Sequence, residues 1–285
     1  MTWWQAVVLG LVEGITEYLP VSSTGHLILV GWLLGLDQDP VRKAAVDAFD
    51  IVVQGGAILA VLGLYAQRVQ QMLAGVVGRD ANGRRLFLNV ALAFLPAAVL
   101  GPVLDDLIEA YLFSAPPVLL ALAVGGAWMI WLDRRARTEP RVSLDEISPR
   151  QALTIGCLQC VAMWPGTSRS MMTIAGGTLV GLRPQQAAEF SFLVGLPTLG
   201  AACAYKLLKN LLHSHETGDP NLFQLLGVGS VVLGIVVATA SAAVAVRGLV
   251  AFLGRYGLAP FGWYRIGLAA FLVLLIAAFG LRIGA

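Results

Sequence analysis

The chain has 285 residues, of which 58% are hydrophobic and 13% charged, and it contains 32 glycines. Soluble globular domains have roughly 45–50% apolar and about 25% charged residues, so this composition departs from that class in both directions. A soluble fold is therefore excluded, and most of the surface must face something other than water. The net charge of +2 says little about partners by itself, and we expect no nucleic-acid partner.

Six apolar segments are long enough to cross a bilayer, for which about 20 residues are needed. In chain order they are Phe49–Tyr65, Leu86–Leu104, Pro116–Leu132, Ala187–Leu208, Leu222–Val246 and Trp263–Leu281. These segments predict an all-α polytopic membrane protein with about six transmembrane helices. We expect residues 1–285 to form a single integral membrane domain.

Two further apolar regions are interrupted by polar residues. Trp3–Leu36 contains two glutamates and then Pro-Val-Ser-Ser-Thr-Gly-His at residues 20–26. Gln151–Leu182 contains Trp-Pro-Gly-Thr-Ser-Arg-Ser at residues 164–170. Each region is interpreted as a re-entrant helical hairpin, in which two half-length helices flank a polar turn. Broken backbone is tolerated at membrane depth only where protein or a water-filled cavity surrounds it.

The two interrupted regions resemble each other. Aligning Pro20 with Pro165 places Ser23 opposite Ser168. The chain is therefore interpreted as two weakly related halves, about 1–132 and 133–285.

Basic residues predict the orientation in the membrane. Arginines gather in two predicted loops, Gln67–Arg85 and Asp133–Arg150, whereas the predicted loop Asp105–Ala115 is acidic. If each hairpin returns to its starting face, both arginine-rich loops lie on one side, which the positive-inside rule assigns to the cytoplasm. The first hairpin then enters from outside and the second from inside. This predicts an inverted-topology repeat, a class of fold that places its sites near the midplane between the repeats.

Glu13 and Glu17 are four residues apart, so on a helix their carboxylates share one face. An ionisable residue in a membrane segment is costly and normally faces the bundle interior or a water-filled cavity. The functional interpretation is a divalent-metal or general-base site. The alternative is that this helix lies at the membrane interface with its acids in water.

The turn at residues 22–26 combines three hydroxyl groups, a glycine and His26 at the start of a half-helix. A helix N-terminus favours anions, a serine can act as nucleophile when a base activates it, and histidine is the usual base near neutral pH. The alternative is that the Ser-Ser-Thr sequence only caps the helix and that His26 is a satisfied interfacial residue.

The second turn is its cationic counterpart, because Arg169 is flanked by Ser168 and Ser170 and is followed by Thr173. The planar guanidinium matches phosphate oxygens, and its charge at depth demands an anion. The alternative partner is Glu13 or Glu17, and such a salt bridge could coexist with phosphate binding. Together the two turns contain the groups needed for phosphoryl transfer.

At this point two long motifs resemble a known family. Glu-Gly-Ile-Thr-Glu-Tyr-Leu-Pro-Val-Ser-Ser-Thr-Gly-His at residues 13–26 and Trp-Pro-Gly-Thr-Ser-Arg-Ser-Met-Met-Thr at residues 164–173 are similar to those of the bacterial undecaprenyl-diphosphatase family, also called bacitracin-resistance proteins. Phe49–Gly56 and Glu189–Phe192 also resemble recurring segments of that family. The similarity runs from about residue 5 to the C-terminus.

The resemblance implies hydrolysis of undecaprenyl diphosphate to the monophosphate and inorganic phosphate, recycling the lipid carrier for peptidoglycan synthesis. It implies a multi-pass protein of the bacterial inner membrane with membrane lipid around it, a site open to the outer face, a divalent cation (Mg²⁺ or Ca²⁺) and bacitracin resistance. A homodimer is left open as the assembly. Carried over by position, the catalytic residues are Glu17, Ser23, His26 and Arg169; the phosphate-binding residues are Thr24, Ser168, Arg169, Ser170 and Thr173; the metal ligands are Glu13 and Glu17.

The mechanistic hypothesis is attack of Ser23 on the terminal phosphorus, with Glu17 or His26 taking the hydroxyl proton. Attack by His26 itself is the main variant. A lipid-phosphate transporter is the rival function, because inverted repeats with broken helices are a transporter architecture. A membrane assembly factor without catalytic activity is a third alternative.

Overall fold

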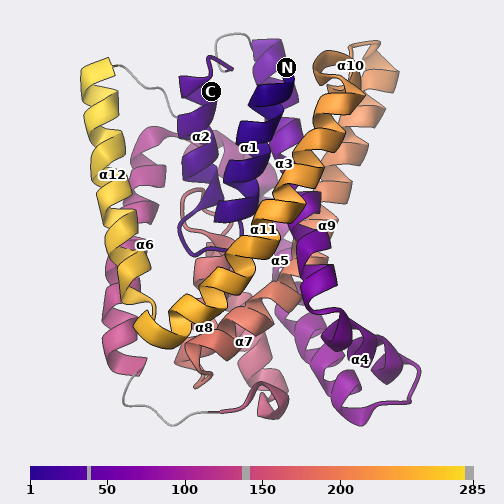
Figure 1. Cartoon of the computed structure of the whole chain (residues 1–285), viewed down its shortest axis with the longest axis vertical. Coiled ribbons are helices and arrows are strands. Elements are labelled where there is room, and N and C mark those ends of the chain that lie inside the picture. Colours follow the sequence, from indigo (N-terminus) through magenta and orange to yellow (C-terminus); the bar gives the residue numbers. More distant parts are fainter. Residues whose placement is uncertain (37–39, 137–141, 280–285) are drawn as a thin grey trace.

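The computed structural model describes residues 1–36, 40–136 and 142–279, and within these ranges its regular structure is helical (Figure 1). The first half contains α1 (Trp3–Thr16), α2 (Ser23–Leu33), α3 (Pro40–Leu64), α4 (Ala66–Val76), α5 (Ala81–Leu112) and α6 (Ala115–Ala136). The second half contains the short 3₁₀ helix η1 (Leu144–Glu146), α7 (Pro149–Val161), α8 (Arg169–Leu179), α9 (Pro184–Thr217), α10 (Leu222–Leu226), α11 (Val228–Tyr256) and α12 (Ala259–Phe279). The all-α prediction is therefore confirmed.

Six helices of the described chain are long and apolar enough to cross a membrane. They contain Lys43–Leu64, Ala81–Asp105, Ala115–Arg135, Pro184–Thr217, Val228–Tyr256 and Ala259–Ala278. Each overlaps one predicted segment, which confirms the prediction of a multi-pass membrane protein. The fifth segment begins later than predicted, because Gly227 has φ 83° and separates the short α10 from α11. That conformation favours glycine and ends a helix.

The two interrupted regions form helical hairpins as predicted. In the view of Figure 1, α1 and α2 lie in the upper half of the molecule, and α7 and α8 lie in the lower half. Their turns therefore approach each other from opposite ends. Pro149 at the first position of α7 and the reciprocal capping of Ser148 and Gln151 explain why that helix begins where it does.

The first hairpin is held against α11 by small residues. A Cβ atom added to Gly10 would lie 2.6 Å from the carbonyl oxygen of Gly234, so α1 and α11 approach too closely for a side chain at Gly10. Close backbone approach of this kind is the usual packing device of membrane helices. It brings α1 into the interior of the bundle, where its acids must find partners.

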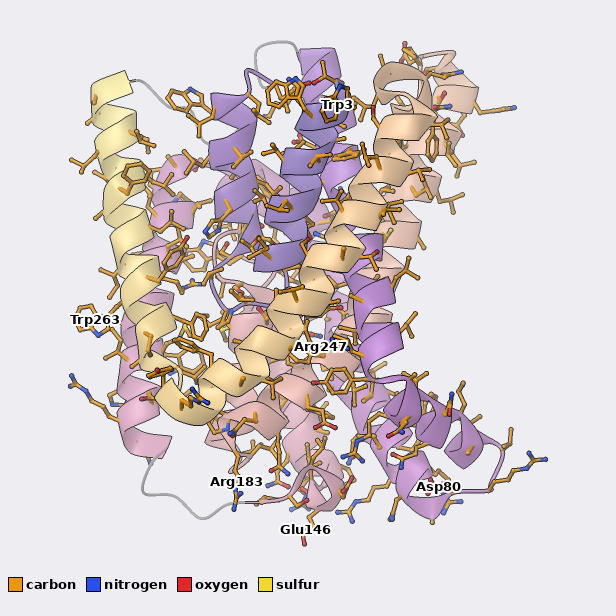
Figure 2. The ribbon with its side chains drawn as sticks, viewed as in Figure 1. Trp3, Asp80, Glu146, Arg183, Arg247 and Trp263 are labelled. Carbon is orange, nitrogen blue, oxygen red and sulfur yellow. The ribbon has the colours of Figure 1, made fainter. Side chains whose placement is uncertain are left out.

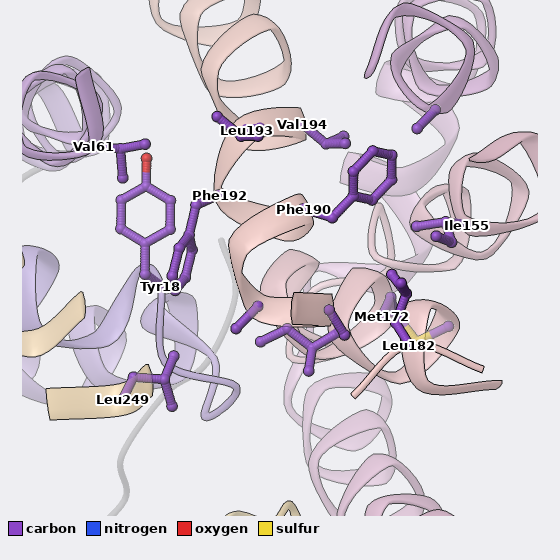
Figure 3. Close-up of a cluster of buried hydrophobic side chains, with 14 of the residues drawn as sticks. Tyr18, Val61, Ile155, Met172, Leu182, Phe190, Phe192, Leu193, Val194 and Leu249 are labelled. Carbon is purple, nitrogen blue, oxygen red and sulfur yellow. The ribbon is translucent and has the colours of Figure 1, made fainter. Parts of the chain in front are cut away.

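Buried apolar side chains from both halves meet around the site. Tyr18 of the first turn packs edge-on against Phe192 of α9, with ring centroids 5.2 Å apart. Figure 3 shows Val61 of α3 beside the Tyr18 ring, and Val194 of α9 beside Phe190. The core therefore joins the first turn to helices of both halves.

Two predicted loops are helical. Residues 67–85, expected to be a loop, belong mainly to α4 and the start of α5, and residues 105–112 continue α5. Helix α4 packs closely on α5, where a side chain at Gly75 would clash with the backbone of Arg84, and Asp80 caps α5 by accepting a hydrogen bond from the N–H of Gly83. Asp80, Glu146 and Arg183 gather at one end of the molecule, opposite to Trp3 (Figure 2). Arg137 and Arg141, which contributed to the orientation prediction, lie outside the described residues.

Candidate active site

The first turn ends in a serine with an unusual backbone conformation. Ser22 has φ 74° and ψ 97°, and its side chain accepts a hydrogen bond from the N–H of Gly25 at 3.4 Å. A positive φ costs a non-glycine residue free energy and reverses the chain sharply. Ser23 is consequently the first residue of α2, at the helix end where anions are stabilised.

The second turn repeats this arrangement at Ser168, which has φ 75° and ψ 117°. Its hydroxyl oxygen accepts from the N–H of Met171 at 3.3 Å, and α8 begins at Arg169. The matching backbone conformations pair Ser22 with Ser168. The sequence alignment, which placed Ser23 opposite Ser168, was therefore wrong by one residue. The error arises because the aligned prolines lie before the reversal of the chain. Pro165 precedes Ser168 by one residue more than Pro20 precedes Ser22.

The two turns contact each other directly. The Ser170 hydroxyl donates to the carbonyl oxygen of Leu19 at 2.9 Å, and the Arg169 Nη2 atom donates to Glu17 Oε1 at 3.0 Å. Glu17 and Arg169 are 152 residues apart in the sequence. The contact between turns predicted from the motifs is therefore present in the fold.

Glu17 is the centre of this contact because each of its oxygens has a different partner. Oε1 accepts from Arg169, and Oε2 accepts from the hydroxyl of Ser23 at 2.9 Å. The carboxylate is 6% exposed and the Arg169 side chain 10% exposed. The alternative in which the first helix lies at the interface with its acids in water is therefore wrong. The salt-bridge alternative for Arg169 is present, and it leaves part of the guanidinium available.

Arg169 is held on three sides. Its Nη1 atom donates to the carbonyl oxygen of Ser191 at 3.1 Å, and its guanidinium carbon lies 5.2 Å from the centre of the Tyr18 ring. The Nε atom has no hydrogen-bond partner among residues 1–36, 40–136 and 142–279. A buried guanidinium that retains an unused N–H can still bind an anion that enters the site.

Glu13 is fully buried, and its carboxylate oxygens accept no hydrogen bond from the part of the chain that the structure describes. Glu17 and Asp50 are close enough for their charges to act on it. Two unpartnered carboxylate oxygens fit a hard divalent cation, whose other ligands can be water and substrate phosphate. The described residues contain no group of three acidic, histidine or cysteine side chains placed to hold a metal by themselves.

Both ring nitrogens of His26 have partners other than the hydroxyl of Ser23. Its Nδ1 atom lies 2.7 Å from the carbonyl oxygen of Ser22, and its Nε2 atom lies 2.6 Å from the hydroxyl of Tyr264. A carbonyl oxygen can only accept, so Nδ1 carries a proton. In the neutral imidazole Nε2 then accepts from Tyr264. The parallel His26 and Tyr264 rings, 5.7 Å apart, are consistent with this pairing.

The remaining predicted residues differ in how far their hydroxyls are engaged. Thr24 is half-buried, and its side chain makes no hydrogen bond to the described residues. The Ser168 and Ser170 hydroxyls lie 3.0 Å apart. Thr173 is fully buried and bonds to the Ser191 hydroxyl at 2.6 Å and to the carbonyl oxygen of Arg169 at 2.9 Å. Thr24 is therefore free to bind a ligand, whereas Thr173 supports the start of α8.

Sequence reasoning missed Ser191, Tyr264 and Arg265. Tyr264 and Arg265 lie on α12, inside the predicted segment Trp263–Leu281, where a charged residue was the available signal. Arg265 is fully buried and donates to the carbonyl oxygen of Gly166 in the second turn at 2.9 Å. No local pattern connected these residues to turns that lie far away in the sequence.

Comparison with known proteins agrees over almost the whole chain. The model of the family described as "Bacitracin resistance protein BacA" matches residues 6–271. A protein of Sorangium cellulosum named undecaprenyl-diphosphatase is 46% identical over 280 residues, covering 96% of this chain and 87% of that protein. Proteins of the same name from Azotobacter vinelandii and Methylococcus capsulatus are each 43% identical, covering 95% and 98% of this chain and 92% and 96% of those proteins.

Proposed function

Because the chain belongs to the bacitracin resistance protein BacA family, we propose that it hydrolyses undecaprenyl diphosphate to undecaprenyl phosphate and inorganic phosphate. The relatives named undecaprenyl-diphosphatase support this activity. The observation that carries the proposal is the chain of contacts from the Ser23 hydroxyl through Glu17 to Arg169. It joins a nucleophile, a base and an anion-binding group where the two turns meet. None of the comparisons favours a transporter.

In the first step the Ser23 oxygen attacks the terminal phosphorus of the diphosphate. A bond forms between Oγ and phosphorus, and the bond from that phosphorus to the bridging oxygen breaks. The lipid monophosphate leaves with the bonding electrons. The hydroxyl proton passes to Glu17 Oε2, which already accepts it at 2.9 Å. A base in hydrogen-bond contact with the nucleophile is the arrangement that activates serine.

In the second step water attacks the phosphoserine and releases inorganic phosphate. Glu17, now protonated, returns its proton to the Ser23 oxygen as the phosphorus–oxygen bond breaks, and a proton from the water leaves with the phosphate. The enzyme is then restored. Positioning and charge neutralisation supply most of the catalysis in phosphoryl transfer.

Tyr264 and the Ser22 carbonyl, which occupy both ring nitrogens of His26, favour Glu17 over His26 as the base for Ser23. They also disfavour the variant in which His26 is the nucleophile. His26 instead fixes the turn that presents Ser23, through its bond to the Ser22 carbonyl oxygen.

Arg169 binds the oxygens of the terminal phosphate, with the hydroxyls of Thr24, Ser168 and Ser170 and the N–H groups at the starts of α2 and α8 as further donors. Thr173 contributes by holding Ser191 and the first turn of α8. The Thr24 hydroxyl makes no hydrogen bond to the described residues, whereas the Ser168 and Ser170 hydroxyls would exchange the hydrogen bonds that they make to each other and to Leu19 for hydrogen bonds to phosphate.

Glu13, with Glu17 beside it, would hold a Mg²⁺ or Ca²⁺ ion. When bound, such an ion neutralises charge on the phosphate oxygens. The unpartnered oxygens of Glu13 support this assignment.

The protein works in the bacterial inner membrane, with the arginine-rich end of the bundle in the cytoplasm and the site open to the outer face. Arg79, Arg84 and Arg85 around the start of α5 support this orientation. Regeneration of undecaprenyl phosphate there recycles the lipid carrier of peptidoglycan synthesis. Removal of the diphosphate also removes the target of bacitracin, which explains the resistance.

The test is phosphate release by the purified protein in detergent from undecaprenyl diphosphate and, as a short-chain probe, farnesyl diphosphate. We expect release that depends on added Mg²⁺ or Ca²⁺. An absence of release with every divalent metal would contradict the proposal. A matched sample of Arg247→Met, which changes an exposed arginine on α11, should retain the wild-type rate.

A further inference from the structure

Arg265 of α12 is a fully buried arginine that the proposed reaction does not use. Its Nη2 atom donates to the main-chain oxygens of Gly166 at 2.9 Å and Ala121 at 3.0 Å. Within the described residues, its Nε and Nη1 atoms have no hydrogen-bond partner and no carboxylate forms an ion pair with it. Carbonyl oxygens therefore hold one side of the guanidinium, and the other side has unused N–H groups.

A buried cation without a counterion is costly in a membrane protein, and such residues mark ligand sites or pair with an opposite charge. The two arginines beside the turns differ in this respect. Arg169 has Glu17 as its counterion, whereas Arg265 has only the partial charges of carbonyl groups. Since a guanidinium does not lose its proton, an anionic ligand is the partner that Arg265 lacks among the described residues.

Arg265 lies beside both turns. Gly166, which it holds, belongs to the second turn. Its Nη2 atom would lie 2.7 Å from a Cβ atom added to Gly125, where the sulfur of Met171 also approaches. It is close enough to His26 of the first turn for its charge to act on that ring. An anion that reaches Arg265 therefore enters the same site as one that reaches Arg169.

The place of α12 indicates which phosphate Arg265 would meet. Helices α12 and α6 pack together at one side of the bundle in Figure 1, and Trp263 of α12 points outward from it in Figure 2. The terminal phosphate must lie at Ser23, where it is attacked. The phosphate attached to the lipid must lie toward the surface from which the polyprenyl chain enters, and α12 forms part of that surface.

We propose that Arg265 binds the lipid-linked phosphate of the diphosphate, while Arg169 binds the terminal phosphate. The inference rests on the proposed function, because it assumes a diphosphate substrate. Two arginines then match two phosphates, and each guanidinium can form paired hydrogen bonds to phosphate oxygens. Arg265 thereby selects diphosphates over single phosphates.

Binding of two probes to the purified protein separates the two positions. One is a farnesyl diphosphate analogue with a methylene group in place of the bridging oxygen, which cannot be hydrolysed between the phosphates. The other is inorganic phosphate, which resembles the terminal phosphate alone. We expect Arg265→Met to weaken binding of the analogue by about 100-fold, because a buried charged partner is lost. The affinity of Arg265→Met for inorganic phosphate should fall by less than about threefold, because separated sites contribute independently to binding.

Arg265→Lys keeps the charge but loses the fork, so its affinity for the analogue should lie between those of wild type and Arg265→Met. If Arg265→Met does not fold, Arg265→Lys still tests the proposal, because its affinities for the analogue and for inorganic phosphate can be compared. Arg247→Met serves as the matched control and should leave both affinities unchanged.

Equal weakening of both probes would assign Arg265 a structural role in holding Gly166 and would overturn the proposal. Unchanged affinity for the analogue in both Arg265 variants would also overturn it. These outcomes are distinct from failure of the proposed function, in which the wild-type protein itself releases no phosphate from undecaprenyl diphosphate.

Discussion

The two polar turns share one backbone design and carry different chemistry. Ser22 and Ser168 have φ angles of 74° and 75°, and each accepts a hydrogen bond from the N–H three residues later. The next residue is Ser23 in one turn and Arg169 in the other. The same reversal therefore places a serine hydroxyl, the proposed nucleophile, at the start of one helix and a cation at the start of the other.

The turns also differ in how firmly they are held. In α8 the residues from Ser170 to Thr178 are all buried, whereas in α2 only Gly25 and Leu27 are buried. The second turn is thus fixed in the core, and the first lies nearer the surface of the bundle. This difference suggests that a rigid anion-binding turn receives the phosphate and a more accessible turn attacks it. The following predictions test that division.

The largest effect is expected for Ser23→Ala. Loss of the nucleophile should lower the turnover number by roughly 10⁴- to 10⁶-fold, as in other hydrolases with a covalent intermediate. Phosphate release measures the loss, and phosphoserine trapped from the wild-type protein identifies the intermediate. The control is Ser214→Ala, at a half-buried serine in the last turns of α9 whose hydroxyl donates to the carbonyl oxygen of Asp219. Near wild-type turnover of Ser23→Ala would rule out serine attack.

Arg169→Lys tests the rigid turn. The ammonium group cannot hold Glu17 and also bind phosphate through a planar fork, so we expect the turnover number to fall by about 10³-fold. The steady-state rate of phosphate release is the measurement. Retained activity in the lysine variant would show that charge alone suffices and that the geometry of the fork is unimportant.

Removal of divalent metal should lower activity, because Glu13 in the first hairpin is a proposed metal ligand. Treatment with EDTA is expected to lower activity by about 100-fold, because charge stabilisation by the ion is lost, and added Mg²⁺ or Ca²⁺ should restore it. In Glu13→Gln the concentration of metal needed for half-maximal activity should rise. A Glu13→Gln variant with the wild-type metal dependence would place the ion elsewhere.

Two threonine substitutions compare a free hydroxyl with an engaged one. Thr24→Val should raise the KM for diphosphate by about tenfold, because one hydrogen bond to a charged group is lost. Thr173→Val should instead lower the thermal stability, by about 1 kcal/mol in unfolding free energy, because the Ser191 hydroxyl loses its partner. Steady-state kinetics and thermal denaturation are measured for both variants. A raised KM in Thr173→Val together with a lowered stability in Thr24→Val would contradict the two assignments.

The smallest effect is expected at the reversal itself. Ser22→Gly should change stability by less than about 1 kcal/mol, because glycine adopts positive φ freely and is an acceptable helix cap. Ser22→Ala should cost about 1–2 kcal/mol more, since alanine keeps the strain and loses the cap. Thermal denaturation of the pair measures the difference. Equal stability of the two would mean that the turn is not strained.

Much of the architecture could be predicted from the sequence because it depends on local patterns. Apolar segments of sufficient length predicted six transmembrane helices, and polar residues within apolar regions predicted the two turns and Glu17, Ser23 and Arg169. Membrane segments are set by hydropathy over short windows, which requires no knowledge of the partner helix. The alignment of the turns failed by one residue because backbone reversal at Ser22 and Ser168 has no sequence signature when glycine is not used.

Only the tertiary structure decided which groups meet. Glu17 contacts Arg169 across 152 residues and His26 contacts Tyr264 across 238. The sequence left Glu17 and His26 as alternative bases, and only the structure shows that Glu17, not His26, accepts from the Ser23 hydroxyl. Arg265 became part of the site only when α12 packed beside the second turn. Residue types determine what chemistry is available, whereas distances between distant segments depend on helix packing, which no local pattern contains.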